Sequence, residues 1–136
     1  MKLTTRSRYG TRLMLDMAER YNQGPIQMGE IAERQNISLK YLEQLIIPLK
    51  KAGYVQSIRG PRGGHMLTVD PEDIKLGEIV QLYEGDMGLS HCVADPAACD
   101  RYGMCALRKV WSEITEEIHG KLNAITFGDL VNGKGL

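Results

Sequence analysis

The 136-residue chain is poor in cysteine and in large aromatic side chains, and it has no long apolar run. Its three cysteines are an odd number, which argues against a closed disulfide framework. One Trp and one Phe leave Leu, Ile, Val and Met to fill most of the core. No apolar run approaches the roughly 20 residues of a membrane span, and the first residues, MKLTTRSRYG, lack a signal-peptide apolar region. We therefore expect a cytoplasmic protein with no membrane partner, whose reduced thiols are available for metal or redox chemistry.

The formal net charge is zero, but the charges are divided unevenly along the chain. Residues 1–65 carry eleven Lys and Arg against five Asp and Glu, whereas residues 66–136 carry six against twelve. A basic half joined to an acidic half is typical of a nucleic-acid binder, in which the basic face meets phosphate and the remainder is turned away. Chance clustering is the alternative that charge alone leaves open.

The spacing of apolar residues predicts three helices in the first part of the chain. They cover residues 7–21, 28–34 and 38–53. Ser38 has the side chain of a good N-cap for the third of them. Pro48 lies inside that helix, where a proline costs roughly 3 kcal/mol, so we expect a kink there or an end near Ile47.

The pattern then changes to two strand-like runs, residues 54–58 and 65–69, around a turn rich in Gly and Pro, which predicts a hairpin. Pro71 opens another helix, residues 85–104 show no periodicity, and a last long helix begins near Ala106. Helix, turn, helix and then hairpin is the order of a winged helix-turn-helix domain. The expected fold class is mainly α with a small β-hairpin: a winged helix-turn-helix domain plus a long C-terminal dimerisation helix.

The same features predict how the chain is divided. Residues 1–84 form the expected DNA-binding domain, residues 85–105 a cysteine-bearing sensor loop, and residues 106–136 a dimerisation helix with a C-terminal cap. The last helix carries apolar residues at spacings of three and four, which suits packing against a second copy of the chain. Packing against the chain's own domain is the alternative. This stripe consists of Leu107, Trp111, Ile114, Ile118, Leu122 and Ile125.

In a winged domain the second helix of the motif lies in the major groove, with its N-terminal residues near base edges. Gln44 can pair bidentately with adenine, Lys40 can meet guanine or phosphate, and Glu43 can accept from cytosine. A flat guanidinium on the wing can enter a narrow minor groove. The alternative is an ordinary solvated surface. The candidate DNA-binding residues are Ser38, Lys40, Tyr41, Glu43 and Gln44 on the helix, and Arg59, Pro61, Arg62 and Gly63 on the wing.

The three cysteines lie close together in HCVADPAACDRYGMC, at Cys92, Cys99 and Cys105. Thiolates are the usual ligands of iron–sulfur clusters, and the start of a helix near Cys105 would stabilise an anionic sulfur. Structural zinc and plain or redox-active thiols are the other readings, although the short cysteine pairs of zinc sites are absent. A cysteine-dependent enzyme needs a base beside the thiolate. Only His91 offers one, so we do not expect an enzyme.

The motifs RSRYG, GEIAERQNISLKYLEQL and SIRGPRGGHMLT resemble the IscR-type family of iron–sulfur-responsive transcriptional regulators, which also includes NsrR and CymR. The resemblance continues through IKLGEIV, the cysteine loop and ITFGDLV. It implies a homodimer whose long C-terminal helix crosses its twofold mate, and an iron–sulfur cluster on the three cysteines, with [2Fe–2S] favoured over [4Fe–4S]. It also implies DNA contacts at Ser38, Lys40, Tyr41, Glu43, Gln44, Arg59, Pro61 and Gly63.

The fourth cluster ligand is where the chain departs from the family pattern. IscR proper carries a histidine three residues after the third cysteine, where this chain has Arg108, which stays protonated and cannot ligate. Other relatives take an acidic residue from the partner's N-terminal helix, where this chain has Arg8. His91 is a weak candidate, and Asp95, Asp100, an external thiol or water are the others.

These observations predict a homodimeric regulator that binds palindromic double-stranded DNA and whose affinity or site choice is set by the cluster. The resemblance implies target genes of cluster assembly, iron or redox stress, and cluster-assembly proteins as partners. A second hypothesis keeps the DNA binding without a cluster. In that case the signal would be thiol oxidation, nitric oxide or a protein partner of cysteine metabolism.

Overall fold

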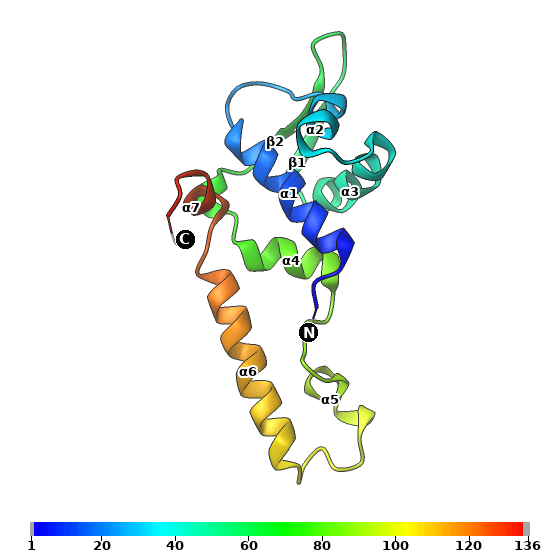
Figure 1. The fold of residues 1–136 in the computed structure, drawn as a ribbon, viewed down its shortest axis with the longest axis vertical. Coiled ribbons are helices and arrows are strands. Elements are labelled where there is room, and N and C mark those ends of the chain that lie inside the picture. The colour runs from blue at the N-terminus through cyan, green and yellow to red at the C-terminus, as the bar shows by residue number, and fades with distance from the viewer. Residues whose placement is uncertain (1, 135–136) are drawn as a thin grey trace.

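The computed structural model describes residues 2–134 and consists of helices with one small hairpin (Figure 1). The wing lies at one end of the molecule, the cysteine loop lies at the other, and α4 crosses between them. The elements are α1 (Thr5–Glu19), α2 (Met28–Gln35), α3 (Leu39–Lys51), β1 (Val55–Ile58), β2 (Gly64–Leu67), the 3-10 turn η1 (Pro71–Asp73), α4 (Leu76–Glu84), α5 (His91–Ala94), the 3-10 turn η2 (Pro96–Ala98), α6 (Ala106–Asn123) and α7 (Phe127–Val131).

The core lies where α1, α3 and α4 meet, and it confirms the helical spacing read from the sequence. Leu13 and Met14 of α1 are fully buried, as are Leu42 and Leu49 of α3 and Ile79 of α4. The buried positions of α1 and α3 recur at intervals of three or four, so one face of each helix turns inward. Burial of these aliphatic faces fixes how the helices cross and leaves their polar faces to solvent.

Helix α3 begins as expected, and of the two outcomes expected at Pro48, a kink or an end near Ile47, the end does not occur. The Ser38 hydroxyl caps it by accepting from the backbone N–H of Tyr41 at 3.1 Å. The expected end near Ile47 is wrong, because the helix continues through Pro48 to Lys51. Proline removes one backbone donor, but buried side chains on both sides, Leu45 and Leu49, hold the helix against the core.

The hairpin is confirmed, with β1 and β2 antiparallel and Val55 opposite Leu67. Its second strand is joined to the chain before α2 by a bridge between Ile26 and His65, next to the loop end of the strand. Gly64 makes this approach possible: its φ is +152°, and a Cβ there would lie 2.4 Å from the Ile26 carbonyl oxygen. The second strand is therefore attached to the body close to the loop, and the loop residues 59–62 are exposed.

The helix expected from Pro71 is interrupted. A 3-10 turn ends at Asp73, and α4 begins only at Leu76. The intervening residues are held extended by the C-terminal segment: the Ile74 carbonyl accepts from the N–H of Phe127 at 2.9 Å, and Lys75 forms a bridge with Thr126. Pairing with a segment fifty residues away therefore overrides the local helical pattern.

The expected apolar stripe of α6 divides along its length. Its last three residues, Ile118, Leu122 and Ile125, are half-buried against the chain's own body. Leu107, Trp111 and Ile114 are 60%, 37% and 39% exposed. The second half of the stripe therefore packs against the chain's own domain, and the first half is left exposed. Within residues 2–134, no helix is long and apolar enough to cross a membrane.

Candidate DNA interface and cysteine loop

The first turns of α3 present a polar surface. Ser38, Lys40, Glu43 and Gln44 are exposed, whereas the opposite side of the helix is packed into the core. Tyr41 is half-buried and lies edge-on to Tyr9 of α1, with ring centroids 6.0 Å apart. Four of the five predicted residues are therefore available to base edges, and Tyr41 also braces α3 against α1.

The wing tip carries Arg59, Pro61 and Arg62, all exposed. Gly63 is buried instead, and its backbone is already engaged: its N–H donates to the Gly60 carbonyl at 2.9 Å, and its carbonyl accepts from Gln27 Nε2 at 2.6 Å. A Cβ at Gly63 would lie 2.0 Å from the Ile58 carbonyl oxygen. Gly63 therefore shapes the wing from inside, while the two arginines project from it.

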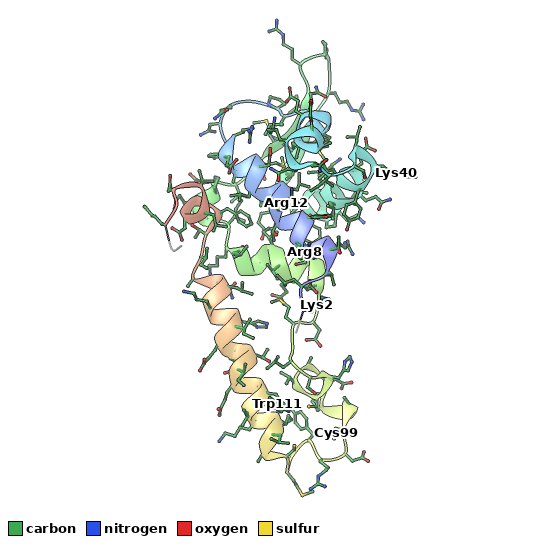
Figure 2. All side chains as sticks on the ribbon, viewed as in Figure 1. Lys2, Arg8, Arg12, Lys40, Cys99 and Trp111 are labelled. Atoms are coloured by element: carbon green, nitrogen blue, oxygen red, sulfur yellow. The ribbon has the colours of Figure 1, made fainter. Side chains whose placement is uncertain are left out.

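Two arginines of α1, Arg8 and Arg12, flank Tyr9, and sequence reasoning did not assign them to the DNA surface. Their guanidinium carbons lie 5.8 and 5.2 Å from the Tyr9 ring centroid, within cation–π range. Because Tyr9 touches Tyr41, they stand beside the start of α3, and Figure 2 shows Arg8 and Arg12 along α1 with Lys40 on the neighbouring helix. Their spacing of four residues was the available signal.

A buried carboxylate joins α1 to the end of α2. Asp16 is 1% exposed and accepts from Arg34 through two bonds, Nε to Oδ2 at 3.1 Å and Nη2 to Oδ1 at 2.8 Å, and from Gln35 Nε2 at 2.9 Å. Burial alone would raise the pKa of Asp16, but the hydrogen bonds from Arg34 and Gln35 outweigh it and lower that pKa. The pair fixes α2, and with it the entry of the chain into α3.

The cysteine segment has more structure than its lack of periodicity indicates, because it contains α5 and η2. These turns are too short to give a periodic pattern. Cys92 is half-buried in α5 with its Sγ 3.1 Å from Ser90 Oγ, Cys99 is exposed after η2, and Cys105 is half-buried at the N-cap of α6. All three thiols are free.

The structure does not bring the three sulfurs together. Across residues 2–134, no group of three or more His, Cys, Asp or Glu side chains is arranged to hold a metal ion. The donor set nevertheless suits an iron–sulfur cluster chemically, because three free thiols lie within fourteen residues of an exposed segment. Cys105 also stands at the start of an eighteen-residue helix that has no side-chain cap.

Arg108, at the position of the family's fourth ligand, has a structural role in the loop. Its Nε donates to the Tyr102 carbonyl at 3.0 Å, and its guanidinium lies 4.0 Å from the Tyr102 ring centroid. The Tyr102 N–H in turn donates to the Cys99 carbonyl at 3.3 Å. Arg108 therefore closes the turn between Cys99 and Cys105. His91 is exposed at the first position of α5, beside Cys92.

Comparison with known proteins decides the family. The Rrf2 family, described as an iron-dependent transcriptional regulator, matches residues 3–133. The chain belongs to the Rrf2 family. Protein rrf2 of Nitratidesulfovibrio vulgaris is 43% identical over the whole chain and 91% of its own length. The regulator IscR of Klebsiella pneumoniae is 39% identical over 98% of the chain and 82% of its own length.

Solved structures of Rrf2-family relatives confirm the winged-helix fold. CymR, the global cysteine regulator of B. subtilis, superposes with a TM-score of 0.83 at 33% identity, covering 98% of both chains. IscR of T. potens superposes with a TM-score of 0.80 at 35% identity, covering 98% of this chain and 88% of the other. The protein is a DNA-binding transcriptional regulator of this family and not an enzyme.

Proposed function

We propose that this Rrf2-family regulator binds palindromic DNA as a homodimer and that an iron–sulfur cluster on Cys92, Cys99 and Cys105 sets its affinity or site choice. The observation that carries the proposal is the placement of the free thiols: they lie at the opposite end of the molecule from the wing and α3 (Figure 1). Cluster assembly, iron or redox-stress genes are the proposed targets. Double-stranded DNA is the proposed partner, with cluster-assembly proteins delivering the cluster.

The proposed DNA surface combines three elements. Lys40, Glu43 and Gln44 face base edges from α3, and Arg59 and Arg62 reach the duplex from the wing. Arg8 on α1 extends this surface beside the start of α3, where a guanidinium is suited to phosphate. Arg12 is already engaged, because its guanidinium donates to the side chain and the carbonyl of Gln35 at the end of α2. Phosphate contacts position the protein, whereas the α3 side chains select the sequence.

Substitutions on α3 and on the wing should have different effects on DNA binding. Gln44→Ala should relax base preference at one position of the site, costing about 1–3 kcal/mol there. Arg62→Ala should weaken binding to all duplexes and lower the slope of log affinity against log salt by about 1. Selection from a library of palindromic duplexes, followed by titration at several salt concentrations, measures both. Lys109→Ala on α6 is the control, and the reverse pattern for the two variants would refute the groove assignment.

The three cysteines are the residues proposed to hold the cluster. The fourth ligand position is open, because Arg108 is a cation whose guanidinium contacts the carbonyl and the ring of Tyr102. When bound, a cluster supplies a centre whose charge and integrity depend on redox conditions. Among this chain's own side chains, His91, Asp95 and Asp100 are the candidates for the fourth position, and an external thiol or water is the remaining source. We propose [2Fe–2S] as the cluster type.

Anaerobic purification with absorption spectroscopy and iron and sulfide analysis tests the cluster directly. The wild-type protein should be coloured and carry iron and sulfide, and Cys99→Ser should reduce both to background because a neutral hydroxyl replaces a thiolate ligand. Ser90→Ala is a matched control, since Ser90 contacts Cys92 but is not a proposed ligand. Loaded wild-type protein should also differ from metal-free protein in affinity for the selected duplex. A colourless wild-type protein, or equal DNA binding in both states, would end this proposal.

One observation favours a second candidate function, a thiol-based sensor without a cluster. Cys99 is exposed and free, and the structural relatives include Staphylococcus aureus CymR in an oxidized form, at 34% identity and a TM-score of 0.76. In this case DNA binding would respond to oxidation of the loop thiols. Iron-free wild-type protein whose DNA affinity changes on mild oxidation would favour the second candidate over the first.

We also propose that the dimer forms through the exposed part of the α6 stripe together with the neighbouring Val110. Leu107, Val110, Trp111 and Ile114 lie at helical spacings of three and one, on one side of the helix, and all are exposed. A contiguous apolar surface of this kind on a small protein marks an interaction site. A second copy supplies the same surface across a twofold axis, which also matches the symmetry of a palindrome.

A further inference from the structure

Tyr83, in the last turn of α4, makes a direct contact with the recognition helix. Its hydroxyl donates to the Leu45 carbonyl of α3 at 2.6 Å, across 38 residues of sequence. Tyr83 is 6% exposed and Leu45 is 1% exposed, so water does not compete for this bond. Leu45 directly follows Gln44, one of the residues proposed to read bases.

The tyrosine ring is enclosed on its other sides by α1. A Cβ at Gly10 would lie 2.2 Å from the ring, so only glycine permits this approach, and the Arg6 guanidinium carbon lies 5.7 Å from the ring centroid. Burial raises the pKa of Tyr83, so its hydroxyl remains protonated and serves as a donor. Tyr83 of α4 therefore contacts two other helices, α1 and α3.

The residues after Tyr83 lead directly into the cysteine loop. The Glu84 carboxylate accepts from the Thr4 N–H at 2.7 Å and from the Thr4 hydroxyl at 2.9 Å, and Glu84 is the last residue of α4. Met87 is then buried beside α4 and α6. The Leu89 N–H donates to Thr115 Oγ1 of α6 at 3.2 Å, three residues before Cys92. A displacement of the loop would therefore act on the end of α4.

Helix α3 is also sensitive to external contacts at this point. Pro48 has no N–H, so the Gln44 carbonyl lacks its partner within the helix. The Tyr83 hydroxyl bonds the adjacent carbonyl, in the turn where the backbone ladder is weakest. A signal at the loop can shift the geometry of this turn only if it binds two states of the protein with different affinity.

We propose that Tyr83 is a positioning residue that couples the state of the cysteine loop to the geometry of α3, and thus to DNA affinity. The proposal rests on the proposed function for the identity of the signal, but the physical link runs through this chain's own residues. By reciprocity, DNA bound at α3 must change the loop by the same factor as the loop changes DNA binding.

The Tyr83→Phe variant keeps the ring and removes only the hydroxyl. We measure the ratio of the DNA affinities of cluster-loaded and metal-free protein on the duplex selected from the library. In Tyr83→Phe this ratio should shrink by roughly five-fold, as expected for one hydrogen bond. If the wild-type ratio is itself below about five, the ratio in the variant should fall to one. Iron content and absorption spectrum should stay as in the wild type. The matched control is Tyr54→Phe. The Tyr54 hydroxyl donates to the Glu78 carboxylate of α4 at 3.1 Å and makes no bond to α3. An unchanged ratio in Tyr83→Phe, or an equal loss in both variants, overturns the proposal.

A second measurement needs no cluster and separates this proposal from the proposed function. In metal-free protein, mass spectrometry measures the rate at which iodoacetamide alkylates Cys92, Cys99 and Cys105. The rates are compared with and without the duplex. DNA should change the rate at one or more of these thiols by about five-fold in the wild type and in Tyr54→Phe. Tyr83→Phe should reduce the change below about two-fold. If DNA has no effect in the wild type, or its full effect persists in Tyr83→Phe, the coupling is refuted whatever the cluster does.

Discussion

Ile114→Glu is expected to convert the dimer to monomers and to weaken binding to a palindromic duplex by about 100-fold, because the two half-sites are then no longer bound as one unit. Ile114 is 39% exposed in one chain, so the substitution should cost the isolated fold little. At a twofold interface each substitution occurs twice, and two carboxylates would have to be buried without partners. Sedimentation equilibrium and DNA titration measure the two consequences.

Lys109→Glu is the matched control for this variant. Lys109 is an exposed residue of the same helix outside the apolar stripe, so a new carboxylate there should leave both assembly and DNA affinity close to wild type. A dimeric Ile114→Glu protein would refute the α6 interface. A monomeric variant that keeps full affinity for the palindrome would instead refute the link between dimerisation and DNA binding.

Arg34→Met is expected to lower the free energy of unfolding by about 2 kcal/mol and Tm by about 7 °C at neutral pH. The substitution removes the two-bond partner of the buried Asp16 carboxylate and leaves it the hydrogen bond from Gln35 and an ion pair with Arg20 at 3.3 Å. Losing the main partner of a buried charge is costly. The expected loss is smaller than for a fully buried pair, because the Arg34 side chain is 31% exposed. Urea unfolding and calorimetry check both values.

The cost of Arg34→Met should depend on pH in a defined direction. The pKa of Asp16 is lowered in the folded protein, so its interaction stabilises the fold above pH 4, roughly the pKa of an unfolded carboxyl. That stabilisation is lost as the pH falls through the lowered pKa of Asp16. The difference from wild type should therefore stay constant from pH 7 to about pH 5 and shrink as the pH falls below about 4. Glu19→Gln, which breaks an exposed pair with Arg20, should cost under about 0.5 kcal/mol; an equal cost in both variants would contradict the special role of Asp16.

Much of the fold could be predicted because it depends on residues close in sequence. Ser38 caps α3 through the N–H of Tyr41, three residues away, and the apolar faces of α1 and α3 repeat at helical intervals. The candidate DNA residues on α3 could be identified for the same reason, since the buried positions of a helix define its exposed ones. The wing followed from two short runs around glycine and proline.

The predictions that were wrong concern places where distant residues compete with local preference. The helix expected from Pro71 is interrupted because Ile74 and Lys75 pair with residues near Phe127. The end expected near Ile47 does not occur because the core holds α3 on both sides of Pro48. The structure of the cysteine segment depends on Arg108 meeting Tyr102, which no periodic pattern indicates.

By itself, the sequence determined the order of helices and hairpin, the polar face of α3 and the chemistry of three thiols, because caps, periodicity and donor type depend on residue identity and near neighbours. The tertiary structure alone decided which part of the α6 stripe is left exposed, that Arg8 and Arg12 lie beside α3, and that Tyr83 reaches Leu45. These features depend on how helices cross, and the crossing is set by packing of the whole core, which no single stretch of sequence contains.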